Sequence, residues 1–382
     1  MTDLQSYFNP IELTALNEHW QTSQIGSFIS SHSNDFFPDL KFAELAIFNV
    51  QEYEGSENSS SSDNCKVRAS FYELYREDCP KIVDLGTLKL MSSRKDSFDS
   101  IQFVCQTLIY NGILPIIIGG GHDISYAIYK AYSHLDKYIT LTTIDKVFDI
   151  GLENDSLASF SHLGKILSHK PSHLFHYINM GYQSYFVSSI AVNMLRELNF
   201  DLYRLGVIKS DITEVEPVMR NTDFLSFDIS AIQNSLANVY SSPNGFSSQE
   251  ACQIMRYAGL SDKLSCLGLF EYNQDLDKNN QTAQLLSQMI WYFIDGYLMR
   301  KQELNPNINN CIKYTVPFED GKNEIVFYKS KSSGRWWMGI PFKSKEHNEL
   351  QNYFVACSYK DYEIANQNEV PERWLKTYNK FI

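Results

Sequence analysis

The hydrophobic positions of this chain alternate between short continuous runs and longer periodic segments. One run, Ile113 to Ile118, contains three consecutive β-branched residues and ends at three glycines, Gly119 to Gly121. A continuous apolar run of this length is typical of a strand that is buried on both faces in a parallel sheet. Apolar residues recur at helical spacing over 97–110, just before this run, and over 124–132, just after it. The pattern predicts a helix, a buried strand, a glycine turn and a second helix.

The same alternation continues over most of the chain. The predicted strands are 43–50, 82–86, 113–118, 138–145, 174–180, 202–207, 224–229 and 264–271. The predicted helices are 67–75, 97–110, 124–132, 160–168, 185–198, 212–220, 247–258 and 282–300. Strands that alternate with helices in this way favour an α/β fold, a parallel sheet with helices on both faces.

The two ends of the chain depart from this alternation. Two short helical patterns, around Pro10–Trp20 and Thr22–Ser30, predict an N-terminal helical segment over 1–35. Short apolar runs at 311–316, 323–328 and 336–340 predict strands with glycine turns between them. We therefore expect an α/β domain over 1–304 and a β-rich extension over 305–382 that packs on it.

A polar stretch interrupts the first part of the α/β pattern. Residues 52–64 are rich in Ser, Asn and Glu and include the run Ser59 to Ser62. Such a segment has few apolar groups whose burial would offset the entropy lost on ordering. The sequence predicts an exposed, mobile loop here.

The overall composition narrows the classes of partner. The chain has 382 residues, 43% of them hydrophobic, and a net charge of −12, with no basic stripe along it. This balance argues against nucleic-acid or anionic-membrane partners, and no apolar run approaches a membrane span. The seven cysteines are odd in number and form no CxxC pair, which favours free thiols and a cytoplasmic protein.

Polar side chains follow four of the predicted strands. His122 follows the glycine turn, Asp145 and Asp149 follow strand 138–145, Asp228 ends strand 224–229 and Glu271 ends strand 264–271. Open α/β sheets bind ligands at the carboxyl ends of their strands, and this mixture of oxygen and imidazole donors suits Mn, Mg or Fe. Each residue taken alone is better explained as a helix cap, a packing residue or a solvated charge. Their joint placement makes a metal or substrate site an equally good interpretation.

These residues also resemble a known family. The segments Gly119-Gly-Gly-His122-Asp, Asp145-x-x-x-Asp149, Ser226-Phe-Asp228 and Phe270-Glu271 are similar in order and spacing to the ureohydrolases, which include arginase, agmatinase and formimidoylglutamase. The resemblance covers roughly residues 40–300 and is nearest to formimidoylglutamase-like members. It implies a three-layer αβα fold around a mostly parallel, eight-stranded sheet. It also implies that a C–N bond of a small amidine or guanidine is hydrolysed with the help of two Mn ions.

The second of these metal sites is degenerate in this sequence. The resemblance assigns His122, Asp145, Asp149 and Asp228 to the first metal, and all four are present. The second metal's own His and Asp positions carry Val147 and Ser230, and valine cannot ligate a metal. We expect at most one Mn per chain, and none if the neighbouring Lys146 neutralises the pocket instead. Three carboxylates in one pocket should also raise the pKa of at least one of them.

Two further positions receive roles from the resemblance. Glu271 matches the Glu that holds the substrate's amidinium, and His162 matches a proton-shuttling His by spacing alone.

Two hypotheses of different class remain open. In the first, the protein is a metal-dependent hydrolase of a small amidine or guanidine. In the second, it is a non-catalytic protein of the same fold that has lost the second metal site and serves binding or regulation. The sequence leaves homo-oligomerisation open.

Overall fold

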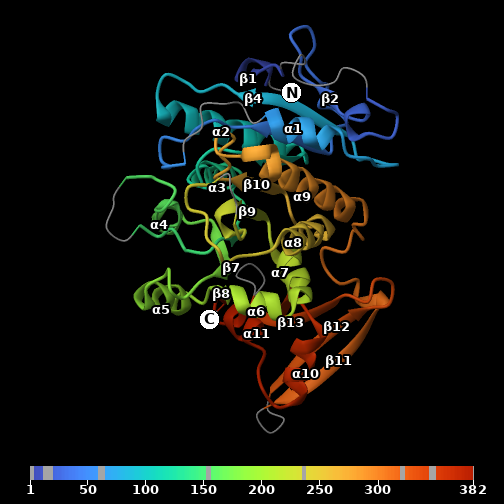
Figure 1. Ribbon diagram of the computed structural model, residues 1–382. Helices are drawn as coiled ribbons and strands as arrows, with labels where there is room; N and C mark the ends of the chain where they lie inside the picture. Colours follow the sequence, from blue (N-terminus) through green and yellow to red (C-terminus); the bar gives the residue numbers. More distant parts are fainter. Residues whose placement is uncertain are drawn as a thin grey trace.

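A ten-stranded sheet forms the centre of the molecule (Figure 1). The computed structural model describes residues 4–11, 20–58, 65–151, 156–234, 238–318, 323–343 and 350–381. Eight parallel strands follow one another across the sheet in the order β4 (Ile82–Leu88), β3 (Leu45–Asn49), β5 (Leu114–Ile118), β10 (Cys266–Phe270), β9 (Phe224–Asp228), β6 (Ile139–Ile144), β7 (Leu174–Tyr182) and β8 (Asp201–Arg204). Two-residue strands, β1 (Phe8–Asn9) and β2 (Ser30–Ser31), pair with β4, and β1 alone is antiparallel. The predicted parallel α/β sheet is confirmed.

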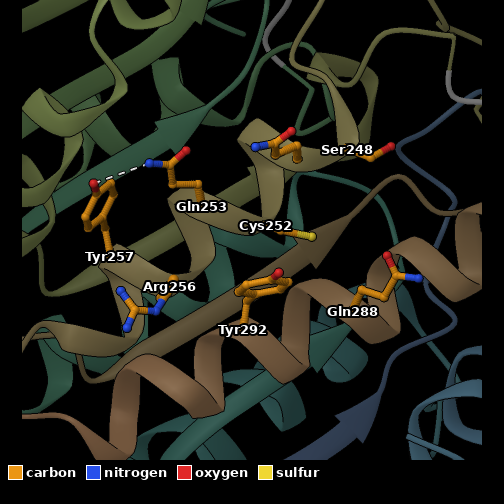
Figure 2. Close-up of a pocket in the computed structure, with 8 residues that line it drawn as sticks. Ser248, Cys252, Gln253, Arg256, Tyr257, Gln288 and Tyr292 are labelled. Carbon is orange, nitrogen blue, oxygen red and sulfur yellow. Dashed lines mark hydrogen bonds between the residues drawn. The ribbon is translucent and has the colours of Figure 1, made fainter.

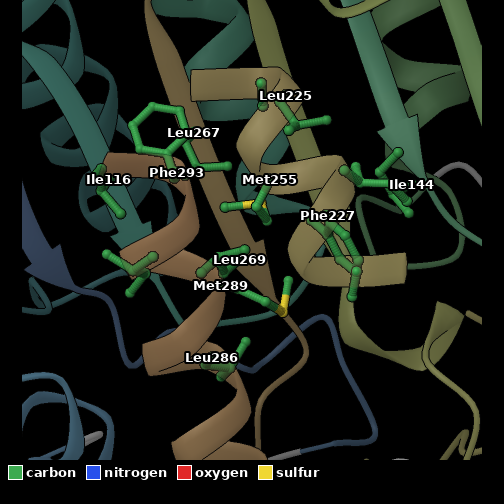
Figure 3. Close-up of a cluster of buried hydrophobic side chains, with 14 of the residues drawn as sticks. Ile116, Ile144, Leu225, Phe227, Met255, Leu267, Leu269, Leu286, Met289 and Phe293 are labelled. Carbon is green, nitrogen blue, oxygen red and sulfur yellow. The ribbon is translucent and has the colours of Figure 1, made fainter. Parts of the chain in front are cut away.

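Helices cover both faces of this sheet and give three layers. One face carries α2 (Arg94–Tyr110), α3 (Ile124–His134), α4 (His162–Ser168) and α5 (Ser189–Glu197). The other carries α1 (Cys65–Tyr72), α6 (Leu205–Ser210), α7 (Val215–Asn221), α8 (Ser248–Leu260) and α9 (Gln281–Leu298). On this second face, Met255 of α8 and Met289 of α9 meet Leu267 and Leu269 of β10 (Figure 3). Every residue of β3, β5, β9 and β10 is buried, as continuous apolar runs require.

Helices α8 and α9 approach each other closely at two glycines. A capping box starts α8, because Ser247 and Glu250 each satisfy the other's backbone N–H. Further along, a Cβ on Gly259 would overlap the carbonyl oxygen of Phe293 and lie 3.0 Å from Cα of Gly296. The missing side chains therefore allow the two backbones to touch.

We expect Gly259→Val to destabilise the fold by about 3 kcal/mol or more, because the new atoms meet the backbone of α9, which cannot yield as a side chain would. Urea unfolding followed by circular dichroism measures the loss. Gly206→Ala is the matched control, since Gly206 lies in α6 and a Cβ there has no neighbour within 4 Å. It should be neutral or stabilising by up to about 1 kcal/mol. Equal stability of Gly259→Val and wild type would contradict the close helix contact.

The C-terminal part forms a separate antiparallel sheet beside α7. Its strands are β11 (Cys311–Phe318), β12 (Asn323–Ser330), β13 (Trp336–Lys343) and β14 (Leu350–Cys357), followed by α10 (Tyr359–Asn366) and α11 (Glu372–Tyr378). Arg220 of α7 is buried and donates to the carbonyl oxygens of Trp336, at 3.1 and 3.2 Å, and of Cys357, at 3.1 Å. Arg335 also pairs with Asp262 at 3.0 Å. These contacts hold the extension on the lower end of the α/β layers in Figure 1.

Four local differences separate the sequence-based expectations from the structure. The expected helix 22–30 is only a 3-10 turn, Ile25–Ser27, where Gly26 lies against Trp20, and residues 12–19 of the other expected helix lie outside the described residues. Strand 202–207 stops at Arg204, where α6 begins. The sequence patterns also missed β14, α10 and α11.

The loop over 52–64 is the fourth difference. Residues 59–64 lie outside the described residues, but the part that is described is anchored. Glu52 and Asn58 are buried, the carbonyl of Glu52 accepts from the N–H of Gly121 at 2.8 Å, and the side chain of Asn58 donates to the carbonyl of Glu271. The assumption that this loop lacks anchors is therefore wrong for 52–58, because polar contacts hold it where apolar ones are few.

Within the described ranges, no helix is long and apolar enough to cross a membrane.

Candidate metal centre

The carboxyl ends of four central strands deliver the polar residues of the site. After β5 the chain turns through Gly119 and Gly120, whose φ angles of 84° and 78° favour glycine. A Cβ on Gly120 would also overlap the side chain of Ile124, the first residue of α3. This turn leads directly to His122, which lies two residues before α3. Asp145 follows β6, Asp228 ends β9 and Glu271 follows β10. Because β5, β10, β9 and β6 are neighbours in the sheet, their ends meet.

Four of these residues form a compact donor cluster. The ligating atoms of His122, Asp145, Asp149 and Asp228 all lie within 4.8 Å of one another. His122 Nδ1 is 3.2 Å from Asp149 Oδ2 and 3.5 Å from the Oδ2 atoms of Asp145 and Asp228. The other imidazole nitrogen, Nε2, is 2.8 Å from Ser226 Oγ. A hydrogen bond at one ring nitrogen that leaves the other facing carboxylates is the usual arrangement of a metal-ligating histidine.

The charges of this cluster are strongly coupled. Burial disfavours the charged imidazole of His122, but hydrogen bonds to Asp145, Asp149 and Asp228 outweigh it and raise the pKa well above its usual value. Burial, with repulsion from Asp149, raises the pKa of Asp145 to about 7 despite the opposing effect of His122. The expected rise in a carboxylate pKa is thus confirmed. One imidazole and three carboxylates fit a hard divalent cation such as Mn, which would take the place of these protons.

The two degenerate positions lie beside this cluster. Val147 and Ser230 both line the adjoining cavity, and their backbone N–H groups donate to the second carboxylate oxygens of the site. The N–H of Val147 is 3.2 Å from Asp145 Oδ1, and the N–H of Ser230 is 2.6 Å from Asp228 Oδ1. The Oδ1 atoms of Asp145 and Asp228, which do not face His122, are therefore already hydrogen-bonded.

Glu271 is held by three donors. Its Oε1 accepts from the N–H of His122 at 2.8 Å and from Ser159 Oγ at 2.5 Å, and its Oε2 accepts from Ser56 Oγ at 2.6 Å. A carboxylate has about four lone-pair sites, so Oε2 keeps one for a further donor. Burial and repulsion from Asp228 raise the pKa of Glu271 to about 7, although its hydrogen bonds oppose the rise.

The backbone conformation at the site is unusual. Glu271 and Asp149 have φ angles of 63° and 53°, in a region that non-glycine residues rarely adopt. The carbonyl of Glu271 accepts from the side-chain amides of Asn58 and, at 2.9 Å, Asn238. Backbone strain that neighbouring contacts hold in place is typical of functional sites.

His162 lies behind the donor cluster. It is buried, its ring centroid is 4.3 Å from that of His122, and its Nδ1 is 3.8 Å from Asp149 Oδ2. Nδ1 must donate to the carbonyl of Ser159, 2.8 Å away, so Nε2 is the unprotonated nitrogen. Among the described residues, Nε2 has no hydrogen-bond partner. Burial and the charge of His122 lower the pKa of His162 well below its usual value. The described residues that line the cavity do not include His162.

A cavity of about 480 Å³ opens in front of the cluster. The described residues that line it are Glu57, Lys146, Val147, Asp149, Ser159, Phe160, Phe186, Asp228, Ser230, Tyr240, Ser241, Ser242, Pro243 and Glu271. Lys146 donates to the carbonyl of Tyr240, and its Nζ lies 5.4 Å from the ring centroid of Phe186. In the described part of the chain, no carboxylate pairs with Lys146, so it does not neutralise the site carboxylates by direct contact. This differs from the expected role of that side chain.

A second hollow, of about 540 Å³, lies on the surface between α8 and α9 (Figure 2). Glutamine, tyrosine and Arg256 side chains line it, and none of the candidate site residues does.

Several residues that support the site were not found from the sequence. Ser56, Asn58, Ser159 and Asn238 hold Glu271, but they lie in polar loops whose composition gives no sign of it. Ser226 could have been found from the sequence, because it stands two residues before Asp228 on the same strand and so faces the same side of the sheet.

A three-layer αβα fold with imidazole and carboxylate donors at the carboxyl edge of its sheet defines the class of arginase-like α/β proteins. The sequence model of the Arginase family matches residues 57–295. The chain therefore belongs to the arginase family.

Relatives with formimidoylglutamase names are similar to this chain. The formimidoylglutamase of Staphylococcus haemolyticus is 24% identical over 238 residues, which cover 57% of this chain and 73% of that protein. The structure of Bacillus subtilis formimidoylglutamase has a TM-score of 0.65 at 16% identity, covering 78% of this chain and 99% of that one. Trypanosoma cruzi formiminoglutamase with Mn2+2 has a TM-score of 0.63 at 18% identity, covering 72% and 99%. These structures share the fold.

Proposed function

We propose that this protein is a hydrolase that splits a C–N bond of a small amidine or guanidine with the help of one Mn ion. The observation that carries the proposal is the convergence of His122, Asp145, Asp149 and Asp228 within 4.8 Å. Two of them, Asp149 and Asp228, line a cavity together with Glu271. Membership of the arginase family supports this kind of reaction, and the names of relatives point to formimidoyl substrates.

The residues of this chain divide the work by their chemistry. His122 and the three aspartates would hold the ion, which when bound supplies Lewis acidity and lowers the pKa of water. Glu271 would accept one N–H of the substrate's amidinium at the remaining lone pair of Oε2. In the reaction, water adds to the amidine carbon and the C–N bond breaks. The departing nitrogen takes a proton, and an amide or a urea remains. His162, to which the resemblance assigns proton transfer, does not line the cavity, so we assign it no contact with the substrate.

The proposal is tested on protein purified without chelator and supplied with Mn. Elemental analysis should find about one Mn per chain. Mass spectrometry should then detect hydrolysis of at least one of N-formimidoyl-L-glutamate, L-arginine and agmatine, with a loss of at least about 100-fold in His122→Ala because the metal centre is disrupted. Turnover that is equal in His122→Ala and wild type would refute the assignment of the site.

The degenerate positions support a second candidate function. Val147 and Ser230 remove two ligands, which favours a non-catalytic protein that keeps the fold for binding or regulation. The same experiment separates the two candidates. One bound Mn without hydrolysis of any of the three substrates would favour the non-catalytic protein.

A further inference from the structure

The cavity in front of the metal centre is electrostatically asymmetric. Four carboxylates of the described residues line it, those of Glu57, Asp149, Asp228 and Glu271, together with a single cation, Lys146. The carboxylates of Asp149 and Asp228 belong to the metal centre, and Glu271 borders it. Lys146 lies toward the 240–243 segment and Phe186. Glu57 also lies on this side, where its backbone N–H is 3.3 Å from the hydroxyl oxygen of Tyr240. A ligand that spans this cavity would therefore meet the carboxylates of the metal centre at one end and, at the other, the cation Lys146.

The ammonium of Lys146 has spare capacity for a ligand. It carries three protons, and among the described residues it contacts the carbonyl of Tyr240 and the face of Phe186. The carbonyl of Tyr240 accepts one of these protons, and the ring of Phe186 attracts the positive charge by a cation–π interaction. Neither neutralises it. A bound carboxylate would supply the missing counter-charge through a charge-assisted hydrogen bond.

We propose that Lys146 forms a carboxylate subsite, so that the substrate is a zwitterion with an amidinium at one end and a carboxylate at the other. This rests on the proposed function, because it assigns the amidinium end to Glu271. The exposed aromatic rings of Phe160 and Phe186, which line the same cavity, provide an apolar wall for the methylene chain between the two charges. Because Lys146 follows Asp145 in the sequence, the carboxylate subsite lies on the loop that carries metal ligands.

A matched pair of ligands tests the subsite without requiring turnover. 4-Guanidinobutyrate and agmatine share a guanidinium and a methylene chain but carry a carboxylate or an ammonium at the far end. Calorimetry with Mn-loaded wild-type protein should show tighter binding of 4-guanidinobutyrate. Lys146→Met keeps the apolar stem and removes the charge, and should weaken 4-guanidinobutyrate about 10- to 100-fold, the usual effect of losing a charge-assisted hydrogen bond. Agmatine should bind the variant no more weakly than the wild type.

Two further variants define the result. Lys146→Arg keeps the charge and should recover most of the affinity, while Lys301→Met removes an exposed lysine outside the cavity and should change nothing. The subsite is overturned if the wild-type protein binds neither ligand or prefers agmatine. It is also overturned if Lys146→Met binds 4-guanidinobutyrate as tightly as the wild type does. Binding through Lys146 without hydrolysis of any substrate leaves the subsite standing and removes the hydrolase proposal. If N-formimidoyl-L-glutamate is hydrolysed and Lys146→Met leaves its KM unchanged, the hydrolase proposal stands and the subsite is overturned.

Discussion

Replacing Val147 by His and Ser230 by Asp in the same chain is expected to raise the Mn content from one ion to two per chain. The two positions line the cavity. Their backbone N–H groups donate to Oδ1 of Asp145 and Oδ1 of Asp228, so these oxygens lie next to them. Each of these oxygens keeps one free lone pair. An added imidazole and carboxylate would therefore complete a second set of donors. Elemental analysis after dialysis against Mn measures the change.

The control for this result is the pair Val147→Leu and Ser230→Ala, which alters the same positions without adding a ligand. It should retain one Mn. Two Mn per wild-type chain would show that the second site never depended on these side chains. One Mn in the His and Asp variant would show that the backbone hydrogen bonds, rather than the missing ligands, close the second site.

The affinity for Mn is expected to fall by up to about 100-fold for each pH unit below about 6.5. Hydrogen bonds to three carboxylates raise the pKa of His122 well above its usual value, and burial raises that of Asp145 to about 7. Both groups therefore carry a proton in mildly acidic solution, and binding of one Mn must release about two protons, so the affinity changes with the square of the proton concentration. Calorimetry in buffers of different ionisation enthalpy counts the released protons.

The metal-free protein should show the opposite trend in stability. A raised pKa means that the folded chain binds more protons than the unfolded chain between the two pKa values. The contributions of Asp145 and His122 are thus fully present at low pH and are lost as the pH rises, between about 4 and 7 for Asp145 and above about 6.5 for His122. Chelator-treated protein should unfold at lower urea concentration as the pH rises through this window. Asp145→Asn should make its stability less dependent on pH between about 4 and 7. Mn binding that releases no protons would refute the coupled cluster.

The parallel α/β class of the central sheet followed from local sequence signals. Continuous apolar runs such as Ile113–Ile118 have one stable environment, the interior of a parallel sheet, so this class needed only the alternation of strands and helices. The order of the strands in the sheet was not predicted. The donor residues were recognisable because parallel strands place their carboxyl ends at one edge. His122, Asp145 and Asp228 therefore had to meet if the strands were neighbours.

Signals were weaker wherever contacts between distant segments decide the structure. Residues 52–58 looked unanchored, because the partners of Ser56 and Asn58 are more than 200 positions away at Glu271. Strand 202–207 looked continuous, yet the chain leaves the sheet at Arg204 to form α6, and apolar residues in a short run do not distinguish a strand from a buried helical turn.

By itself, the sequence determined the α/β class and the presence of imidazole and carboxylate side chains after four of its strands. It also determined that Val147 and Ser230 carry no strong metal ligand, because residue type alone decides whether a side chain can ligate. Only the tertiary structure decided how many donors hold Glu271, that Lys146 donates to the carbonyl of Tyr240, and that His162 Nδ1 donates to the carbonyl of Ser159, which leaves Nε2 unprotonated. Those features depend on hydrogen bonds between loops that are remote in sequence, and no local pattern of hydrophobic and polar residues encodes their geometry.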